Sequence, residues 1–192
     1  MALSSADSSA LLAQDLPRIA TSSRSRSDLY LLAENGYLPV TGFMNAQDSA
    51  SSAETMNITT GEPWSIPVIF PISAAKAAAL KGAKKAILMA GDKPCGVIDI
   101  EETFEIDKPQ FNKNIFRTED EAHPGVEWLR DAGTHSVAGK VHVFPDWQLE
   151  IEGDLAISPT AVKAEIAKKG WKKIVAFQTR NPIHRAHEFC TK

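Results

Sequence analysis

The sequence predicts an α+β fold that passes into α/β, with a strand-rich N-terminal domain over residues 28–157 and the first strand and helix of a second domain over residues 158–192. Two observations predict this fold class. Between residues 60 and 150, short apolar or alternating runs separated by Gly, Pro and Asp recur, which is typical of strands and hairpins. From Ser158 onward, a helix signal, a short apolar run and a second helix signal follow one another, which is the order of an α/β domain. We therefore place a domain boundary between Gly153 and Ser158.

The composition is that of an ordinary globular protein and argues against several function classes. The 192 residues are 43% hydrophobic and carry a formal net charge of −3, without the basic stripe that binding to nucleic acid requires. No run of about 18 apolar residues exists, so no membrane span is predicted. The two cysteines, Cys95 and Cys190, lack the spacing of a disulfide framework or a zinc site, and a reducing cytoplasm is the simplest location.

The first 27 residues are rich in Ser and Ala and are placed outside the predicted domain as a flexible segment. Residues 11–13 are too short an apolar run for a secretory signal, which needs about 7 to 15 residues. Serine and arginine are also typical of organelle transit peptides, but Asp7 and Asp15 count against that interpretation. A helix is predicted next over residues 28–34, with Asp28 as its cap and Gly36 as its stop.

The middle of the chain is predicted to consist of strands with short helices between them. Residues 64–70 are expected to form an edge strand, because Pro67 has no N–H group to give to a neighbouring strand. Ser73 is expected to cap a helix over residues 74–81 that Gly82 ends. Residues 84–89 and 95–106 are predicted as two strands joined by a turn, and residues 136–144 as a further strand. A short helix is expected to begin near His123.

Two groups of polar residues in this region have structural interpretations that compete with functional ones. Carboxylates lie at Asp99, Glu101, Glu102, Glu105 and Asp107. They resemble paired catalytic carboxylates or a cation site, but their alternation with apolar residues indicates the solvated face of a strand. The histidines are His123, His135 and His142. Their spacing matches no zinc pattern, so we expect surface or turn positions.

The C-terminal part begins with a helix signal and leads to a polar motif. Ser158 and Pro159 have the cap-then-proline order of a helix start, and Gly170 is expected to end that helix. Residues 173–177 form a short apolar run typical of a buried strand. The motif QTRNPIHRAHE follows at residues 178–188. Within it, Asn181 and Pro182 predict a second helix start, with Asn at the N-cap and Pro at the first helical position.

The start of this second helix is a candidate anion site. A helix N-terminus presents free N–H groups and the positive end of the macrodipole, which favour a bound phosphate. His184 and His187 are spaced i,i+3, so they share one face of the helix. The side chains expected to converge there as hydrogen-bond donors are Gln178, Thr179, Arg180, His184 and His187.

The motif resembles the signature of the ATP sulfurylase (sulfate adenylyltransferase) family, within the nucleotidylyltransferase superfamily. Three further stretches, in the family's order, resemble its N-terminal landmarks: residues 36–44 (GYLPVTGFM), 64–68 (WSIPV) and 121–126 (EAHPGV). The resemblance covers residues 29–192. It implies a PUA-like N-terminal domain, followed by a Rossmann-like nucleotidylyltransferase domain of which this sequence contains the first strand and helix.

The resemblance also implies an activity, namely the reaction of ATP with sulfate to give adenylyl sulfate and pyrophosphate. The implied ATP-binding residues are Gln178, Thr179, Arg180, Asn181, His184 and His187. Arg180 and Gln178 are expected to bind sulfate as well, and the catalytic set comprises all of these residues except Gln178. We expect Mg²⁺ to arrive with ATP, without a metal held by the protein itself. A homo-oligomer is implied for the full-length protein.

Two alternatives stay open at this point. The first is a non-catalytic PUA-like module that binds a partner protein or RNA, and the second is a nucleotidylyltransferase with another acceptor. The family's second motif, of the Gly-Arg-Asp type, is absent from the 192 residues. We therefore expect a truncated chain with little turnover by itself.

Overall fold

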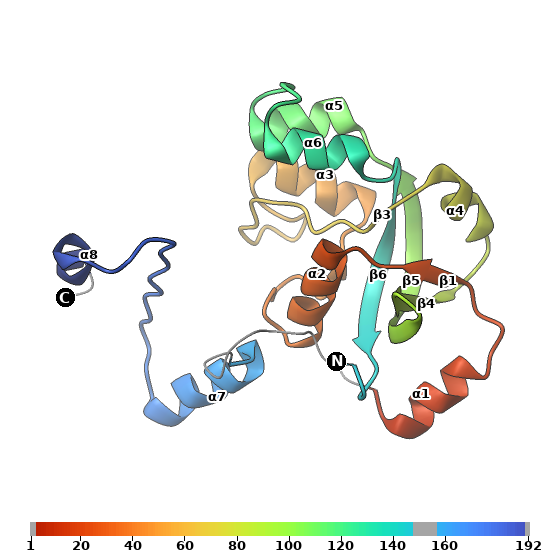
Figure 1. The fold of residues 1–192 in the computed structure, drawn as a ribbon, viewed down its shortest axis with the longest axis horizontal. Helices are drawn as coiled ribbons and strands as arrows, with labels where there is room; N and C mark the ends of the chain where they lie inside the picture. The colour runs from red at the N-terminus through yellow and green to blue at the C-terminus, as the bar shows by residue number, and fades with distance from the viewer. Residues whose placement is uncertain (1–2, 148–156, 191–192) are drawn as a thin grey trace.

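The computed structural model describes residues 3–147 and 157–190. The first range forms a mixed α/β fold around a six-stranded sheet, whereas the second carries two helices joined by a segment that extends away from the sheet (Figure 1). The strand order is β1-β4-β5-β6-β2, and β3 also pairs with β6. β1 runs parallel to β4, whereas the other pairs are antiparallel. The strands are β1 (Arg18–Ala20), β2 (Gly42–Phe43), β3 (Pro71–Ile72), β4 (Lys85–Ala90), β5 (Lys93–Glu105) and β6 (His135–Val143).

The three long strands confirm the strands predicted over residues 84–89, 95–106 and 136–144. β4 and β5 form a hairpin whose turn contains Gly91 at φ +61°. β5 pairs with β6 along almost its whole length, with one irregularity between Ile100 and Glu102. Gly139 lies opposite Ile100 with φ +145°, and a Cβ atom there would be 1.8 Å from the Asp99 carbonyl oxygen. This close approach of two strands is possible only at a glycine.

The N-terminal segment belongs to the fold, which corrects the expectation that residues 1–27 are a flexible segment outside the domain. Helix α1 (Ser5–Leu12) begins after Ser4, whose hydroxyl accepts a hydrogen bond from the backbone of Asp7. β1 extends the sheet beyond β4, and Ile19 is 2% exposed in the main core. A three-residue strand with one buried side chain gives almost no periodic pattern, which is why the sequence did not predict it.

Helix α2 (Ser23–Ala33) begins earlier than the predicted residue 28. Ser22 is its N-cap and accepts a hydrogen bond from the backbone of Ser25 at 3.0 Å. Serine is strongly preferred at this position, and Asp28 consequently lies inside the helix instead of capping it. At the other end Asn35, at φ +56°, adopts the left-handed conformation expected at Gly36. Asparagine tolerates this conformation better than most residues.

Residues 64–70 do not form the predicted edge strand, and only the two residues of β3 pair with β6 in this region. Prolines at positions 63, 67 and 71 remove the N–H groups that a strand would donate. Side chains hold the segment instead. Ser136 accepts a hydrogen bond from the backbone N–H of Phe70 at 3.0 Å, and Ser52 donates one to the carbonyl of Trp64 at 2.7 Å.

Short helices cover the ends and faces of the sheet. They are α3 (Ala46–Thr55), α4 (Ala74–Ala79), α5 (Lys108–Phe111), the π-helix η1 (Asn112–Phe116) and α6 (Pro124–Asp131). The predicted helices near residues 74 and 123 are confirmed, with Ser73 and His123 as their N-caps. Figure 1 shows α3, α5 and α6 grouped at one end of the sheet. There a small core forms around Ile69, Phe111 and Leu129.

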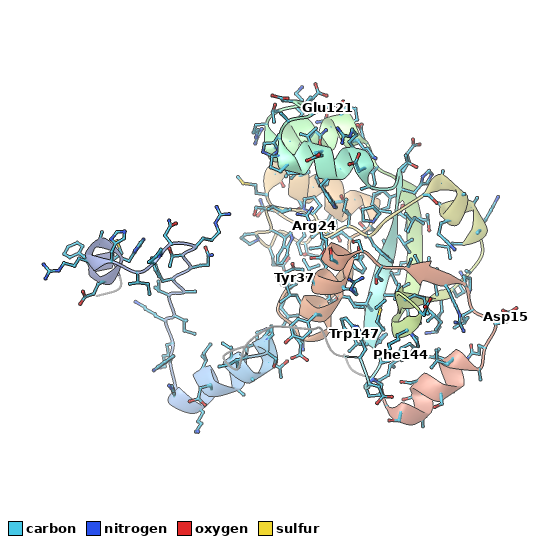
Figure 2. All side chains as sticks on the ribbon, in the orientation of Figure 1. Asp15, Arg24, Tyr37, Glu121, Phe144 and Trp147 are labelled. Atoms are coloured by element: carbon cyan, nitrogen blue, oxygen red, sulfur yellow. The ribbon has the colours of Figure 1, made fainter. Side chains whose placement is uncertain are left out.

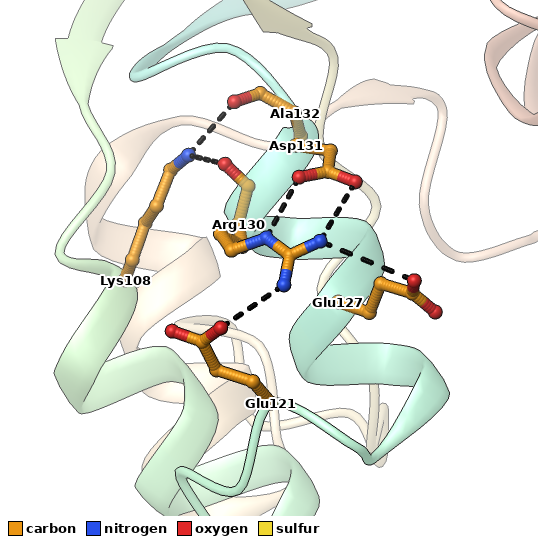
Figure 3. A network of polar contacts seen from close by, with 6 residues as sticks. All are labelled: Lys108, Glu121, Glu127, Arg130, Asp131 and Ala132. Atoms are coloured by element: carbon orange, nitrogen blue, oxygen red, sulfur yellow. Dashed lines mark hydrogen bonds and ion pairs between the residues drawn. The ribbon is translucent and has the colours of Figure 1, made fainter.

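A polar network closes the corner between α5 and α6 (Figure 3). Lys108 donates to the carbonyls of Arg130 at 3.0 Å and Ala132 at 2.7 Å, and so satisfies acceptors at the end of α6. The Arg130 guanidinium binds Asp131 at 2.8 and 3.1 Å and Glu121 at 3.1 Å. Its hydrogen bond to Asp131 lowers the pKa of that carboxyl below the ordinary value. The side chains of Arg130, Glu121 and Asp131 are exposed, so their ion pairs contribute little to stability. Lys108 is the residue that connects α5 to α6.

Three of the five carboxylates considered above are engaged in structural contacts. Asp99 pairs with Lys85 on β4 and lies 3.4 Å from His142 Nε2 on β6. Glu102 accepts a hydrogen bond from the first backbone N–H of α3 at 2.9 Å, and Asp107 caps α5. Within the described residues, no group of three or more His, Cys, Asp or Glu side chains is arranged to hold a metal ion.

Candidate functional site

The helix that leads to the candidate site forms as predicted. Helix α7 (Pro159–Lys169) has Ser158 as its N-cap and ends at Gly170, which has φ +65°. Thr160 donates a hydrogen bond to the carbonyl of Glu34 at 3.1 Å, and Lys163 donates one to the carbonyl of Asn35. These contacts join the start of α7 to the end of α2. The predicted domain boundary at residues 153–158 lies mostly outside the described residues.

The strand predicted over residues 173–177 is not formed, which corrects the sequence analysis. The segment is extended without strand pairing, and Val175 is 94% exposed. A strand needs a neighbour to satisfy its backbone N–H and C=O groups, and the described residues provide none next to this segment. The apolar run has the composition of a buried strand, but no strand among the described residues pairs with it.

The second helix also begins later than predicted. Helix α8 (Arg185–Cys190) starts four positions after Asn181. Asn181 instead takes part in a small turn, in which its backbone N–H donates to Thr179 Oγ1 at 3.1 Å and Thr179 Oγ1 donates to its carbonyl at 3.2 Å. His184 occupies the capping position, since its Nδ1 accepts from the backbone of Ala186 at 3.3 Å.

The two histidines of the motif lie together. Their ring centroids are 3.9 Å apart, and His187 Nδ1 accepts a hydrogen bond from the backbone N–H of His184 at 3.3 Å. Because both Nδ1 atoms act as acceptors, the proton of each neutral ring lies on Nε2. Phe177 packs against His187 with ring centroids 5.5 Å apart.

The predicted donors do not converge on one volume in this structure. Thr179 and Asn181 form one local unit, and His184 and His187 form another. The side chains of Gln178 and Arg180 are free of hydrogen bonds and ion pairs within the part of the chain that the structure describes, and Arg180 is exposed. The short spacing of the motif produces these local pairs, and the described residues do not bring the pairs together into one site.

A second candidate site, which the sequence did not predict, lies in the N-terminal part. It is a pocket of about 750 Å³. Its polar residues Arg24, Asp28 and Tyr37 come from α2 and the turn after it, whereas its rings come from Trp64, Phe116 and Trp128. Sequence reasoning assigned Asp28 to a helix cap and Trp64 to a strand. The available signal was the i,i+4 spacing of Arg24 and Asp28 on one helix face, which becomes visible only once α2 is known to start at Ser23.

The chain is similar to known proteins along its length. The profile of the PUA-like domain family matches residues 2–146, and that of ATP-sulfurylase matches residues 153–192. A sulfate adenylyltransferase of Deinococcus radiodurans is 42% identical over 176 residues, which are 92% of this chain and 45% of the relative. One from Synechocystis is 38% identical, over 94% of this chain and 47% of the relative. The chain thus spans just under half the length of these relatives.

The fold is also similar to that of a solved structure. A hexameric APS kinase from Thiobacillus denitrificans superposes with a TM-score of 0.68 at 20% identity, over 96% of this chain and 33% of that one. At this identity the similarity concerns the fold. None of the described helices has both the length and the apolar character needed to cross a membrane.

Proposed function

Because the chain belongs to the PUA-like domain family over residues 2–146 and aligns along more than nine tenths of its length with sulfate adenylyltransferases, we propose that it is the N-terminal part of a sulfate adenylyltransferase. The reaction of the whole protein joins sulfate to ATP. A sulfate oxygen attacks the α-phosphorus, the bond from that phosphorus to the bridging oxygen breaks, and pyrophosphate leaves. The observation that carries the proposal is this alignment together with the motif at residues 178–188.

We propose that residues 158–192 open a Rossmann-like catalytic domain that follows the PUA-like domain. The ends of the two matching family profiles, at residues 146 and 153, support a boundary in this region. The apolar run at residues 173–177 and the exposed side chains of Ile174 and Val175 support a first buried strand, since such a run is expected to pair inside a sheet. Homo-oligomerisation and a cytoplasmic location belong to the same proposal.

The chemical difficulty of this reaction is the repulsion between two anions. Two like charges about 4 Å apart cost on the order of 4 kcal/mol at an effective dielectric constant near 20. A helix dipole returns only about 0.3 to 1 kcal/mol per charge in an exposed setting. Helix α8 is short, so side chains must supply most of the compensation.

We assign that compensation to the motif residues. Arg180 grips sulfate through parallel hydrogen bonds from its guanidinium, which never loses its charge, and Gln178 donates from its amide beside it. Thr179 and Asn181 orient the attacking oxygen and the α-phosphate. The local turn that joins these two residues supports a shared role.

His184 and His187 form the remaining part of the ATP site in this proposal. Their Nε2–H groups donate to phosphate oxygens on which negative charge grows as pyrophosphate leaves. Their ring contact supports action as a pair. The six residues assigned to the site include no carboxylate, and proteins usually bind Mg²⁺ through one or two carboxylates together with the phosphates of the substrate. The ion is therefore treated as part of the nucleotide substrate.

The test uses the full-length protein and sulfate-dependent release of pyrophosphate from ATP. We expect Arg180→Ala and His184→Ala each to lose at least about 2 kcal/mol of transition-state stabilisation, roughly thirtyfold in kcat/KM. Arg18→Ala, which removes an exposed arginine of β1, is the matched control and should leave the rate unchanged.

Substitution of the acceptor separates the alternatives. Phosphate and small organic acids are offered in place of sulfate, and a preference for one of them would identify a nucleotidylyltransferase with another acceptor. A wild-type protein that releases no pyrophosphate with any acceptor would favour the non-catalytic module. Near-normal rates in both variants would remove the residue assignments while leaving the activity intact.

A further inference from the structure

We propose that the pocket between α2, the segment at residues 63–69, η1 and α6 binds an aminopurine nucleotide, at a site separate from residues 178–187. All residues that line this pocket lie between positions 24 and 128, so the motif contributes nothing to it. Its volume of about 750 Å³ falls within the usual range for small-molecule sites. A mostly apolar cavity with a few convergent polar groups is the type of surface on which such ligands bind.

The ring surfaces of the pocket are held in place before any ligand binds. The Trp64 indole N–H donates to the carbonyl of Ile66 at 2.6 Å, and the Trp64 backbone N–H donates to the carbonyl of Met56 at 2.8 Å. Tyr37 meets Trp64 edge to face, with centroids 5.3 Å apart and planes at 74°. Preorganised rings lose little conformational entropy on binding, which favours stacking of a planar ligand.

Phe116 provides a further ring that cannot move freely. It packs on Gly125, where a Cβ atom would lie 2.5 Å from a carbon of the ring. The floor beneath these rings is closed by buried Val68, Ile69 and Phe111. The pocket therefore accepts a flat apolar body from one side.

Asp28 and Tyr37 form a polar part of the pocket that is suited to a hydrogen-bond donor on the ligand. Tyr37 donates its hydroxyl proton to Asp28 Oδ1 at 2.9 Å, and no donor to Oδ2 is found among the described residues. Burial raises the pKa of Asp28 and, with the nearby Asp28 charge, raises the pKa of Tyr37 to about 12. The tyrosine therefore stays a donor at neutral pH. An exocyclic amino group on a purine ring supplies the N–H that the remaining carboxylate oxygen accepts.

The positive charge of Arg24 is suited to an anionic group on the ligand. Arg24 is exposed and lines the pocket, and Figure 2 labels it together with Tyr37. Its guanidinium carbon lies 4.0 Å from the ring centroid of Trp128. Within the residues that the structure describes, the Arg24 side chain makes no hydrogen bond and no ion pair within 4.0 Å. This cation–π contact holds the guanidinium against the Trp128 ring and leaves its N–H groups available to a phosphate. A ligand with an amino group for Asp28, a flat ring and a phosphate for Arg24 is an aminopurine nucleotide.

The experiment is a titration of the 192-residue chain with AMP, followed in the indole region of a ¹H–¹⁵N NMR spectrum. The four tryptophans are Trp64, Trp128, Trp147 and Trp171, and single Trp→Phe variants assign their signals. We expect AMP to shift the signals of Trp64 and Trp128 and to leave that of Trp147 in place. Adenosine should bind more weakly because it lacks the anion, and ribose 5-phosphate should not shift either signal because it lacks the ring.

Variants test the two polar contacts separately. Arg24→Gln should weaken AMP binding at least about fivefold without changing the binding of adenosine, whereas Arg18→Gln, outside the pocket, should change neither. AMP should bind more tightly than IMP, whose 6-oxo group faces the carboxylate, and Asp28→Asn should reduce that preference. Spectral dispersion confirms that each variant is folded.

Several outcomes would overturn the proposal. They are the absence of shifts at Trp64 and Trp128 with millimolar AMP, equal shifts with ribose 5-phosphate, or unchanged AMP binding in Arg24→Gln. Trp171 lies outside the pocket and precedes the motif at residues 178–188 in the sequence. A shift of Trp171 without shifts of Trp64 and Trp128 would also overturn the pocket proposal. None of these outcomes decides the proposed function, which is tested by pyrophosphate release from the full-length protein.

Discussion

Ser136→Ala should show how much stability comes from the serine hydroxyl that accepts a backbone hydrogen bond from residues 64–70, where no strand forms. Ser136 is completely buried on β6, and its hydroxyl accepts from the backbone N–H of Phe70, which is itself 1% exposed. Alanine removes the acceptor but not the donor, so a buried N–H group loses its partner in a place that water cannot reach. The cost of such an orphaned donor is about 1 to 3 kcal/mol. The small cavity left by the hydroxyl adds to it, and we expect a total of about 2 to 3 kcal/mol.

Urea unfolding followed by tryptophan fluorescence measures this loss. For a domain of this size the melting temperature should fall by roughly 4 to 10 °C. Native-state hydrogen exchange adds a local measurement, since the Phe70 amide should exchange much faster in the variant. Ser9→Ala is the control, because the Ser9 hydroxyl bonds the Ser5 carbonyl on an exposed helix face. A change of less than about 0.5 kcal/mol in Ser136→Ala, equal to the control, would refute the reasoning.

Three further changes have definite expected outcomes. Gly139→Ala places a methyl group against a backbone oxygen of β5. We expect the free energy of unfolding to fall by more than about 4 kcal/mol, or circular dichroism to show that the protein does not fold. The control Gly82→Ala, whose methyl group meets nothing within 4 Å, should lower it by only about 1 kcal/mol. Burial raises the pKa of Asp99, but the hydrogen bond and charge of Lys85 outweigh it and the pKa is lowered. The stabilising effect of ionised Asp99 is therefore present at neutral pH and lost as the pH falls below about 4. The free energy of unfolding of Asp99→Asn should be lower than that of wild type by about 0.5 to 1 kcal/mol at neutral pH. Urea titrations in acid should give the same free energy of unfolding for both proteins. Lys108→Met keeps the apolar stem but leaves the final carbonyls of α6 without a donor, so we expect a loss of about 1 kcal/mol and faster amide exchange confined to α6.

The elements that the sequence predicted correctly have signals within a few residues of one another. Helices α4, α6 and α7 each begin with a residue that caps its own first turn: Ser73, His123 and Ser158. β4, β5 and β6 are long enough for their apolar pattern to exceed chance. The site roles of six residues of the motif, which rest on its order in the chain, stay a prediction. Their local contacts, such as that between Thr179 and Asn181, also follow from short spacing.

The errors have a common cause as well. The strand expected at residues 64–70 does not form, because prolines remove the N–H groups that it would donate. The backbone N–H of Phe70 instead bonds the side chain of Ser136, a serine 66 positions away. The strand expected at residues 173–177 has the right composition but no partner in the described residues. β1 was missed because its pairing with β4 joins residues that lie far apart in the sequence.

The sequence by itself determined the family motif, the capped helices and the long strands. The caps bond the backbone of their own first turn, and the long strands carry an apolar pattern within their own residues. Only the tertiary structure decided that the N-terminal segment completes the sheet and that Arg24, Asp28, Tyr37, Trp64 and Trp128 surround one pocket. Those arrangements depend on contacts between distant parts of the chain. Such contacts are selected by burial and hydrogen-bond satisfaction over the whole fold, which no short stretch of sequence encodes.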